Sequence, residues 1–98
     1  MVTSLRRLFE YFAQAKNSKM KGLRVDQFVK LATDCNLLDT KVTAKGCQRI
    51  FVDCCQDTPV MEFMKFIKAI EIMAEIKGML YEELATYLAL LGKKVTKS

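Results

Sequence analysis

The sequence contains no histidine and no tryptophan, and it has a single proline among its 98 residues. Without histidine, the chain lacks the side chain that most often carries acid and base chemistry near neutral pH. It also lacks a G-x-S-x-G nucleophile turn and a G-x-x-x-x-G-K-[ST] phosphate loop. These absences predict a protein that is not an enzyme, with no catalytic residues and no bound cofactor.

Glycine is scarce as well, and its four residues are scattered singly, so no segment is typical of a linker between domains. We therefore expect a single domain over residues 1–98, with a core at about 3–91 and a flexible tail at 92–98. The N-terminus meets charged residues too early for a secretory signal, and charges interrupt the apolar-rich stretch at 61–79. Neither export nor membrane binding is expected.

Four cysteines are present, and outside an exported protein they are expected to be free thiols in a reducing compartment. Cys35 and Cys47 fall on apolar helical faces, which indicates small core residues. Cys54 and Cys55 are adjacent, a poor geometry for a disulfide. Because no C-x2-C spacing and no histidine accompany them, no metal site is predicted.

Apolar residues recur at the i, i+3, i+4 and i+7 spacing of an amphipathic helix in each of five segments. The predicted helices cover residues 4–15, 26–37 or 38, 43–54, 62–77 and 81–91. Their candidate N-caps and stops are Thr3 or Ser4, Asp26, Thr43, Gly78 and Gly92. The residues predicted to face the core are Leu5, Leu8, Phe9, Phe12, Phe28, Val29, Leu31, Ala32, Ile50, Phe51, Phe63, Phe66, Ile67, Ile70, Met73, Ala74, Leu84, Tyr87, Leu88 and Leu91, together with Cys35, Cys47 and Cys54.

The order helix, polar loop, short extended piece and helix occurs twice. Leu23 is followed five positions later by Phe28, and Met61 by Phe66. An EF-hand has this framework: the apolar residue occupies loop position eight and the aromatic residue position thirteen, and two such loops can pair as a tiny two-stranded sheet. The sequence therefore predicts an all-α fold of two EF-hand-like units followed by a fifth helix.

The two loops lack the carboxylates that calcium requires, namely several acids and a bidentate Glu at position twelve. At positions one, three, five, nine and twelve, loop one places Lys16, Ser18, Met20, Arg24 and Gln27, and loop two places Cys54, Gln56, Thr58, Glu62 and Lys65. A register shifted by one residue gives loop one Asn17, Lys19, Lys21 and Phe28, which is no better. The ammonium of Lys65 would repel a divalent ion, so neither loop is predicted to bind calcium.

One segment is more specific than the EF-hand framework. Residues 30–39 read K-L-A-T-D-C-N-L-L-D, then Lys41-Val42-Thr43 and Ile50-Phe51-Val52 follow. This block resembles the tubulin polymerization-promoting protein family, whose pattern is close to K-L-C-K-D-C-x-[VI]-[IL]-D-G, x-V-T and I-V-F. The resemblance covers roughly residues 3–77. It implies the EF-hand-like fold and a role in binding tubulin.

The chain departs from that pattern in places. Ala32 replaces a cysteine of the pattern, and Thr40 replaces a glycine. The family has a longer basic C-terminal region that is implicated in tubulin binding. Here the segment Gly92-Lys93-Lys94-Val95-Thr96-Lys97 is at most a shortened form of it.

Positive charge is unevenly distributed, with a net charge of +5. The candidate partner-binding residues are Lys16, Lys19, Lys21 and Arg24 in loop one and Lys93, Lys94 and Lys97 at the C-terminus. Such clusters suit nucleic acid, anionic lipid or an acidic protein surface, and they also occur as simple solvated faces. Nucleic acid is disfavoured because no aromatic residue is interleaved for stacking and no DNA- or RNA-binding module is recognised.

The six methionines allow either an adaptable groove for target peptides or core packing, and core packing is favoured for Met61, Met64 and Met73. Glu71, Glu75, Glu82 and Glu83 indicate a solvated face beside Lys68 and Lys77.

Together with the resemblance, these observations predict a non-enzymatic, cytoplasmic protein that binds tubulin or microtubules and promotes their polymerisation or bundling. The alternative is a calcium-independent adaptor of the cytoskeleton, cilium or flagellum that does not bind tubulin directly.

Overall fold

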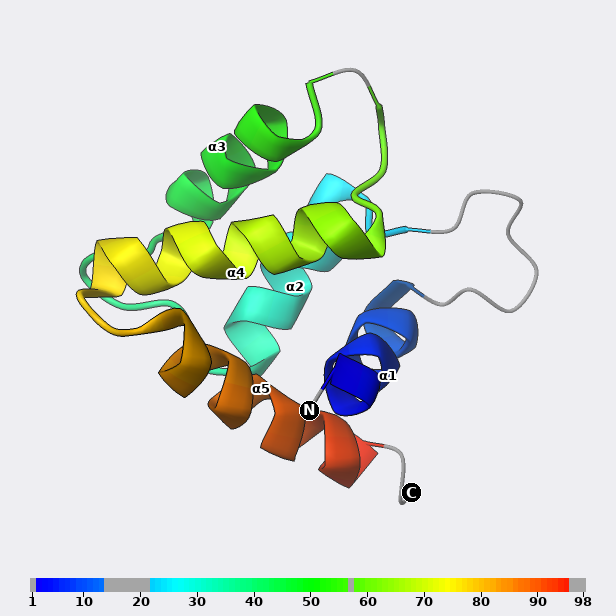
Figure 1. Ribbon diagram of the computed structural model, residues 1–98. Helices are drawn as coiled ribbons and strands as arrows, with labels where there is room; N and C mark the ends of the chain where they lie inside the picture. The colour runs from blue at the N-terminus through cyan, green and yellow to red at the C-terminus, as the bar shows by residue number, and fades with distance from the viewer. Residues whose placement is uncertain (1, 14–21, 57, 96–98) are drawn as a thin grey trace.

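Five helices make up the part of the chain that the computed structural model describes, namely residues 2–13, 22–56 and 58–95. They are α1 (Val2–Ala13), α2 (Val25–Asp34), α3 (Ala44–Cys54), α4 (Phe63–Lys77) and α5 (Tyr81–Val95) (Figure 1). The all-α class predicted from the sequence is confirmed. None of these helices is long and apolar enough to cross a bilayer.

The two interhelical loops are joined by an antiparallel bridge between Leu23 and Met61. The N–H of Leu23 donates to the carbonyl of Met61 at 2.9 Å, and the N–H of Met61 donates back to the carbonyl of Leu23 at 2.7 Å. Both residues, and the paired Phe28 and Phe66, are fully buried. The bridge joins the residues at position eight of the two loops, counted from Lys16 in loop one and from Cys54 in loop two, which confirms the predicted EF-hand-like pairing.

An aromatic cluster joins α1 to α4 in the core. The ring of Phe9 lies 5.5 Å from that of Phe63 and 5.4 Å from that of Phe66, between centroids. Most of the predicted core residues are buried, whereas Val29, Ile67 and Leu91 are partly buried and pack against the core. The prediction for Tyr87 was wrong, because 39% of this residue is exposed. The prediction for Met64 was wrong, because its side chain is 75% exposed, while Met61 and Met73 are buried.

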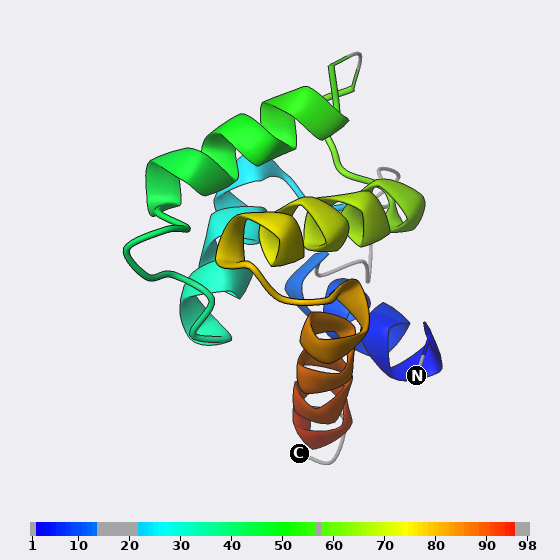
Figure 2. The same ribbon diagram turned by 60° about the vertical axis from the view of Figure 1, so that its left-hand side comes forward.

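Helix α5 packs against α1 and α4 and closes the side of the fold opposite α3 (Figures 1 and 2). Leu84, Ala85, Leu88 and Ala89 are buried there. Helix α5 therefore covers apolar surface of α1 and α4. This packing also places the N- and C-terminal helices side by side.

The predicted end of the last helix at Gly92 was wrong, since α5 continues to Val95. A Cβ atom on Gly92 would lie 2.2 Å from the carbonyl oxygen of Ser4, so only a hydrogen fits between α1 and α5. Ser4 is likewise not an N-cap, because α1 begins at Val2 and Ser4 is buried inside it. The glycine therefore permits a close helix crossing rather than a helix stop.

Helix α2 begins one residue earlier than predicted, because Arg24 and not Asp26 is its N-cap. The side chain of Gln27 accepts a hydrogen bond from the backbone N–H of Arg24 at 2.9 Å, which fixes the first turn. Two other predicted ends are confirmed. Thr43 caps α3 by accepting from the N–H of Gly46 at 3.0 Å, and Gly78 ends α4 in the left-handed conformation.

Candidate functional site

Most of the predicted partner-binding residues lie outside the described part of the chain. Lys16, Lys19 and Lys21 fall in residues 14–21, and Lys97 falls in residues 96–98. Lys93 and Lys94 belong to the last turn of α5, but their side chains are not described. Of the predicted set, only the side chain of Arg24 can be placed.

The side chain of Arg24 is exposed at the start of α2. Its Nε lies 3.7 Å from the Oδ1 of Asp26, and the two side chains are 61% and 73% exposed. Exposed pairs of this kind contribute only about 0 to 1 kcal/mol, so the guanidinium remains available to an acidic partner. Arg24 thus stands at the described edge of loop one and faces solvent.

Residues 30–39, which carry the family resemblance, include the end of α2 and form hydrogen bonds with α4 and α5. Helix α2 ends at Asp34, earlier than predicted, because Asn36 adopts a left-handed φ of 57° and the N–H of Leu37 turns back to the carbonyl of Ala32 at 2.8 Å. This turn leaves the carbonyl of Cys35 directed at α5. The hydroxyl of Tyr87 donates to that carbonyl at 2.7 Å.

Asp39 connects the same segment to the end of α4. Lys77 Nζ donates to its Oδ2 at 2.6 Å, and the N–H groups of Lys41 and Val42 each donate to its Oδ1 at 2.8 Å. These hydrogen bonds, led by that from Lys77, lower the pKa of Asp39 from 3.8 to about 2. The residues of this segment therefore fix the positions of α4 and α5, which is a structural role.

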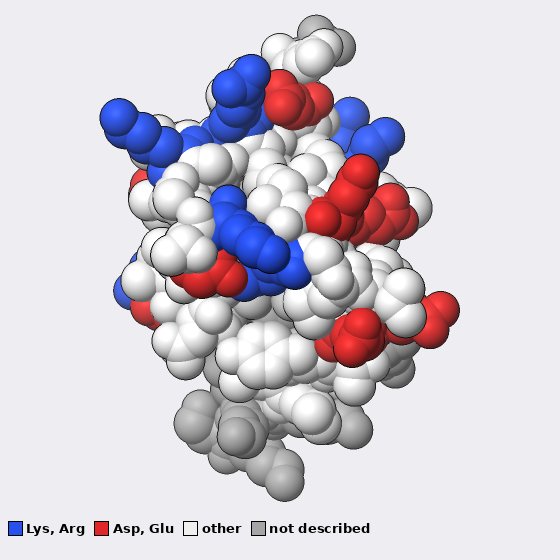
Figure 3. All heavy atoms as spheres, turned by 90° about the vertical axis from the view of Figure 1, so that its left-hand side faces the viewer, with Lys and Arg blue, Asp and Glu red and all other residues white. Residues whose placement is uncertain are grey.

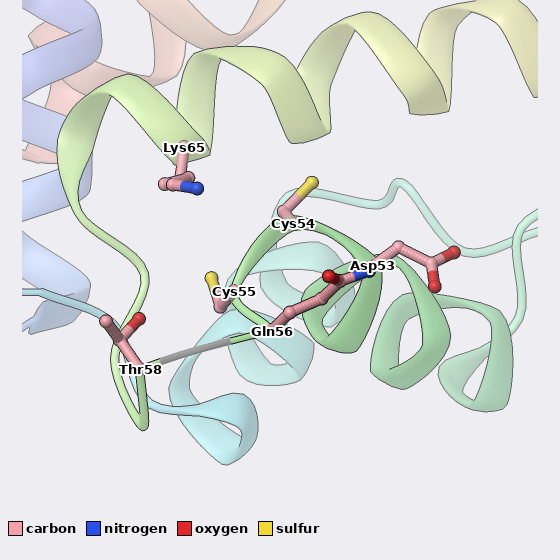
Figure 4. A pocket seen from close by; sticks show the side chains of 6 residues that line it. All are labelled: Asp53, Cys54, Cys55, Gln56, Thr58 and Lys65. Carbon is pink, nitrogen blue, oxygen red and sulfur yellow. The ribbon is translucent and has the colours of Figure 1, made fainter.

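Loop two encloses a hollow of about 120 Å³ where an EF-hand would hold its ion. It is lined by Asp53, Cys54, Cys55, Gln56, Thr58 and Lys65. In Figure 4 the Lys65 side chain reaches from α4 toward the end of α3, while the Asp53 carboxylate is directed away from it. Within the described residues, no three His, Cys, Asp or Glu side chains are grouped so that they could hold a metal ion.

All four cysteines are free and buried. Burial raises the pKa of the Cys35 thiol to about 11, and the nearby Asp34 carboxylate adds to the effect. Burial also raises the pKa of Cys47, Cys54 and Cys55, even though Lys68 and Lys65 oppose it at Cys54. Because the thiolate is the nucleophile and the metal ligand, these protonated thiols are poorly suited to either chemistry at neutral pH.

Sequence reasoning missed a group of exposed cations around α3. Lys41 precedes this helix, Lys45 and Arg49 lie one turn apart on its outer surface, and all three are exposed. Figure 3 shows several basic side chains in the upper part of the view, with one acidic group among them, and further basic and acidic groups from the middle downward. The i, i+4 spacing after the Thr43 cap was the signal that could have identified them.

A comparison with protein-family models identifies the family of the chain. The p25-alpha model, which describes the tubulin polymerization-promoting protein family, matches residues 6–98. The chain belongs to the p25-alpha family. No curated protein sequence and no solved structure matches it significantly.

Membership of the p25-alpha family associates the chain with tubulin and microtubules. The match also extends past the resemblance at residues 3–77 to include α5. Tyr87 and Gly92, which attach α5 to the rest of the fold, therefore both lie within the family domain.

Proposed function

We propose that this p25-alpha protein is a non-enzymatic, single-domain protein that binds tubulin directly and promotes the polymerisation or bundling of microtubules in the cytoplasm. The observation that carries the proposal is the family match over residues 6–98. The EF-hand-like pairing of Leu23 with Met61 supports it, because it is the paired-loop fold that the family resemblance implies.

The chemistry of the chain favours binding over catalysis. Histidine is absent from the sequence, and the thiols of Cys35, Cys47, Cys54 and Cys55 are buried with raised pKa values. The ammonium of Lys65 lines the hollow of loop two, where it would repel calcium. We therefore propose that binding to tubulin does not depend on calcium or on a cofactor.

Binding is proposed to be electrostatic, with the basic residues of loop one and the C-terminus as contributors. Lys16, Lys19, Lys21 and Arg24 place four positive charges within residues 16–24, with no acid among them. Tubulin tails are rich in glutamate, so several ion pairs can form together. Each exposed pair contributes only about 0 to 1 kcal/mol, and useful affinity therefore needs several of them.

Co-pelleting with stabilised microtubules over a series of salt concentrations tests the proposal. The bound fraction should fall as salt rises, because the Debye length shortens from about 10 Å at 0.1 M to about 3 Å at 1 M. A variant with Lys16, Lys19, Lys21 and Arg24 all changed to Glu should pellet less at low salt. If the variant is folded and pellets like the parent, the tubulin-binding site lies elsewhere on the protein.

A complete lack of co-pelleting at low salt would contradict direct tubulin binding. That result would favour the alternative function, a calcium-independent adaptor of the cytoskeleton, cilium or flagellum. Adding unpolymerised tubulin to the labelled protein and recording amide chemical shifts separates the two further. An adaptor of this kind would show no shifts with tubulin alone.

A further inference from the structure

The described cations divide into those that have an ion-pair or aromatic partner within the chain, exposed pairs included, and those that have none. The guanidinium of Arg6 lies 4.5 Å from the centre of the Phe63 ring. Three more cations form ion pairs within the chain: Arg24 with Asp26, Lys30 with Asp34, and Lys77 with Asp39. Among the described side chains, the cations without such a partner are Arg7, Lys41, Lys45, Arg49, Lys65 and Lys68.

Five of these cations belong to α3, to the loop that precedes it and to the adjacent helix α4. Lys41, Lys45 and Arg49 follow the exposed side of α3 and the loop before it, while Lys65 and Lys68 belong to α4. Helices α3 and α4 pack against each other and run in opposite directions (Figures 1 and 2). We name these five residues the α3 basic face.

The contribution of α4 to this face is supported by electrostatics at the end of α3. Lys65 lines the hollow of loop two together with Cys54, the last residue of α3, and the positive charges of Lys68 and Lys65 both act to lower the pKa of that thiol. Lys41 and Lys45 stand at the other end of the helix, with Arg49 between. Positive charge therefore extends along the whole length of α3.

Val52 and Asp53 add one apolar and one acidic side chain near these cations. Val52 lies one turn after Arg49 and is 59% exposed, which offers an apolar contact among the charges. Asp53 is the acid beside it, and Figure 4 shows its carboxylate directed away from Lys65. The remaining cation, Arg7, lies on α1, which does not contact α3.

The spacing of the cations matches an extended acidic chain. Lys45 and Arg49 are four residues apart on a helix, a separation of about 6 Å along its axis. In an extended peptide, side chains on one side recur every second residue, which is about 6.4 to 6.8 Å. Alternate carboxylates of a glutamate run can therefore meet successive cations of α3 without bending the peptide.

We propose that the α3 basic face binds an extended, glutamate-rich segment of a protein partner. On the proposed function this segment is the acidic tail of tubulin, so the inference rests on that function for the identity of the partner. The acidic segment lies along α3, with Val52 contacting its backbone or an apolar side chain. This surface is made of other residues than the predicted loop-one and C-terminal lysines.

Peptide titration tests the proposal on the whole chain. The isotope-labelled protein is titrated with a short oligoglutamate peptide at low salt, and amide shifts are recorded. Saturable shifts should centre on α3 and on the first turns of α4. Changing Arg49 to Glu should weaken binding about threefold, and changing Lys45 and Arg49 together to Glu about tenfold.

Arg7→Glu is the matched control, because it makes the same charge change on an exposed helical arginine away from α3. It should leave the dissociation constant nearly unchanged. The proposal is overturned if Arg7→Glu weakens binding as much as Arg49→Glu, if the shifts are confined to loop one, or if no shifts occur. It is also overturned if a single-stranded oligonucleotide binds α3 more tightly than the peptide, or if the α3 shifts depend on protein concentration alone, which indicates a second copy.

Microtubule co-pelleting separates this inference from the proposed function. If the parent pellets and the folded double variant pellets equally well, the function stands and the α3 site is wrong. If the peptide binds α3 but the parent does not pellet, the site stands and the partner is a different acidic protein. Loss of pelleting in the double variant, with Arg7→Glu unaffected, supports both.

Discussion

The hydroxyl of Tyr87 donates a hydrogen bond of 2.7 Å to the backbone carbonyl of Cys35. It joins the middle of α5 to the C-cap of α2, two elements far apart in the sequence. The carbonyl is available because the turn at Asn36 directs the chain away from the helix axis. Although 39% of Tyr87 is exposed, its polar end is therefore fixed within the fold.

Replacing Tyr87 with Phe should lower the free energy of unfolding by about 1 kcal/mol, because the carbonyl of Cys35 loses its donor. Urea unfolding monitored by circular dichroism measures the change. Tyr81→Phe is the matched control on the same helix and should change stability by less than half as much. Equal effects of the two substitutions would show that the hydrogen bond contributes nothing.

The pair of Asp39 and Lys77 should make stability depend on acid pH. The pKa of Asp39 is lowered from 3.8 in the unfolded chain to about 2 in the folded protein. Its contribution is therefore complete above about pH 4 and is lost as the pH falls toward 2. The parent should lose stability more steeply over this window than Asp39→Ala, as measured by urea unfolding at each pH.

A thermodynamic cycle with Lys77→Met provides the control for this pair. The coupling between the two substitutions should be favourable at pH 6 and much weaker at pH 2, because about half of the Asp39 carboxyl is then protonated even in the folded protein and no longer attracts the ammonium. Coupling that does not change with pH would contradict the assignment of the low pKa to this contact.

Changing Gly92 to Ala should destabilise the protein by about 2 kcal/mol, although alanine favours helix formation. The added methyl group would lie 2.2 Å from the carbonyl oxygen of Ser4, so α1 and α5 must separate. Gly46→Ala is the control, since the nearest atom to its Cβ is the side-chain oxygen of Thr43 at 3.3 Å. Thermal melting should separate the two variants clearly, and equal melting temperatures would contradict the close crossing.

Calcium at millimolar concentration should cause no localised, saturable amide shifts in loop two. The reason is the ammonium of Lys65, which lines the hollow together with the protonated thiols of Cys54 and Cys55. Potassium chloride at matched ionic strength controls for general salt effects. Saturable shifts confined to residues 53–65 would contradict the prediction.

Much of the fold follows from local sequence. Helical periodicity identified the five helices, and Thr43 and Gly78 marked two of their ends, because caps depend on one side chain or one left-handed residue. The repeat of Leu23 with Phe28 and Met61 with Phe66 predicted the pairing of the loops. These features depend on neighbours in the chain, which is why they could be recognised without a structure.

Contacts between distant residues could not be predicted in this way. Lys77 was expected on a solvated face, but its side chain is only 14% exposed and meets Asp39. Gly92 was expected to stop a helix, but it permits a close crossing with Ser4. Met64 fits the apolar pattern of α4, yet no other helix covers that side.

The sequence by itself determined the helices, the EF-hand-like repeat, the family and the basic character of the chain, because each depends on composition or short-range spacing. Only the tertiary structure decided which described cations have an ion-pair or aromatic partner within the chain and which, along α3, have none. Charge can be counted from sequence, but the availability of a charge depends on which side chains the packing of distant helices brings within a few ångströms of it.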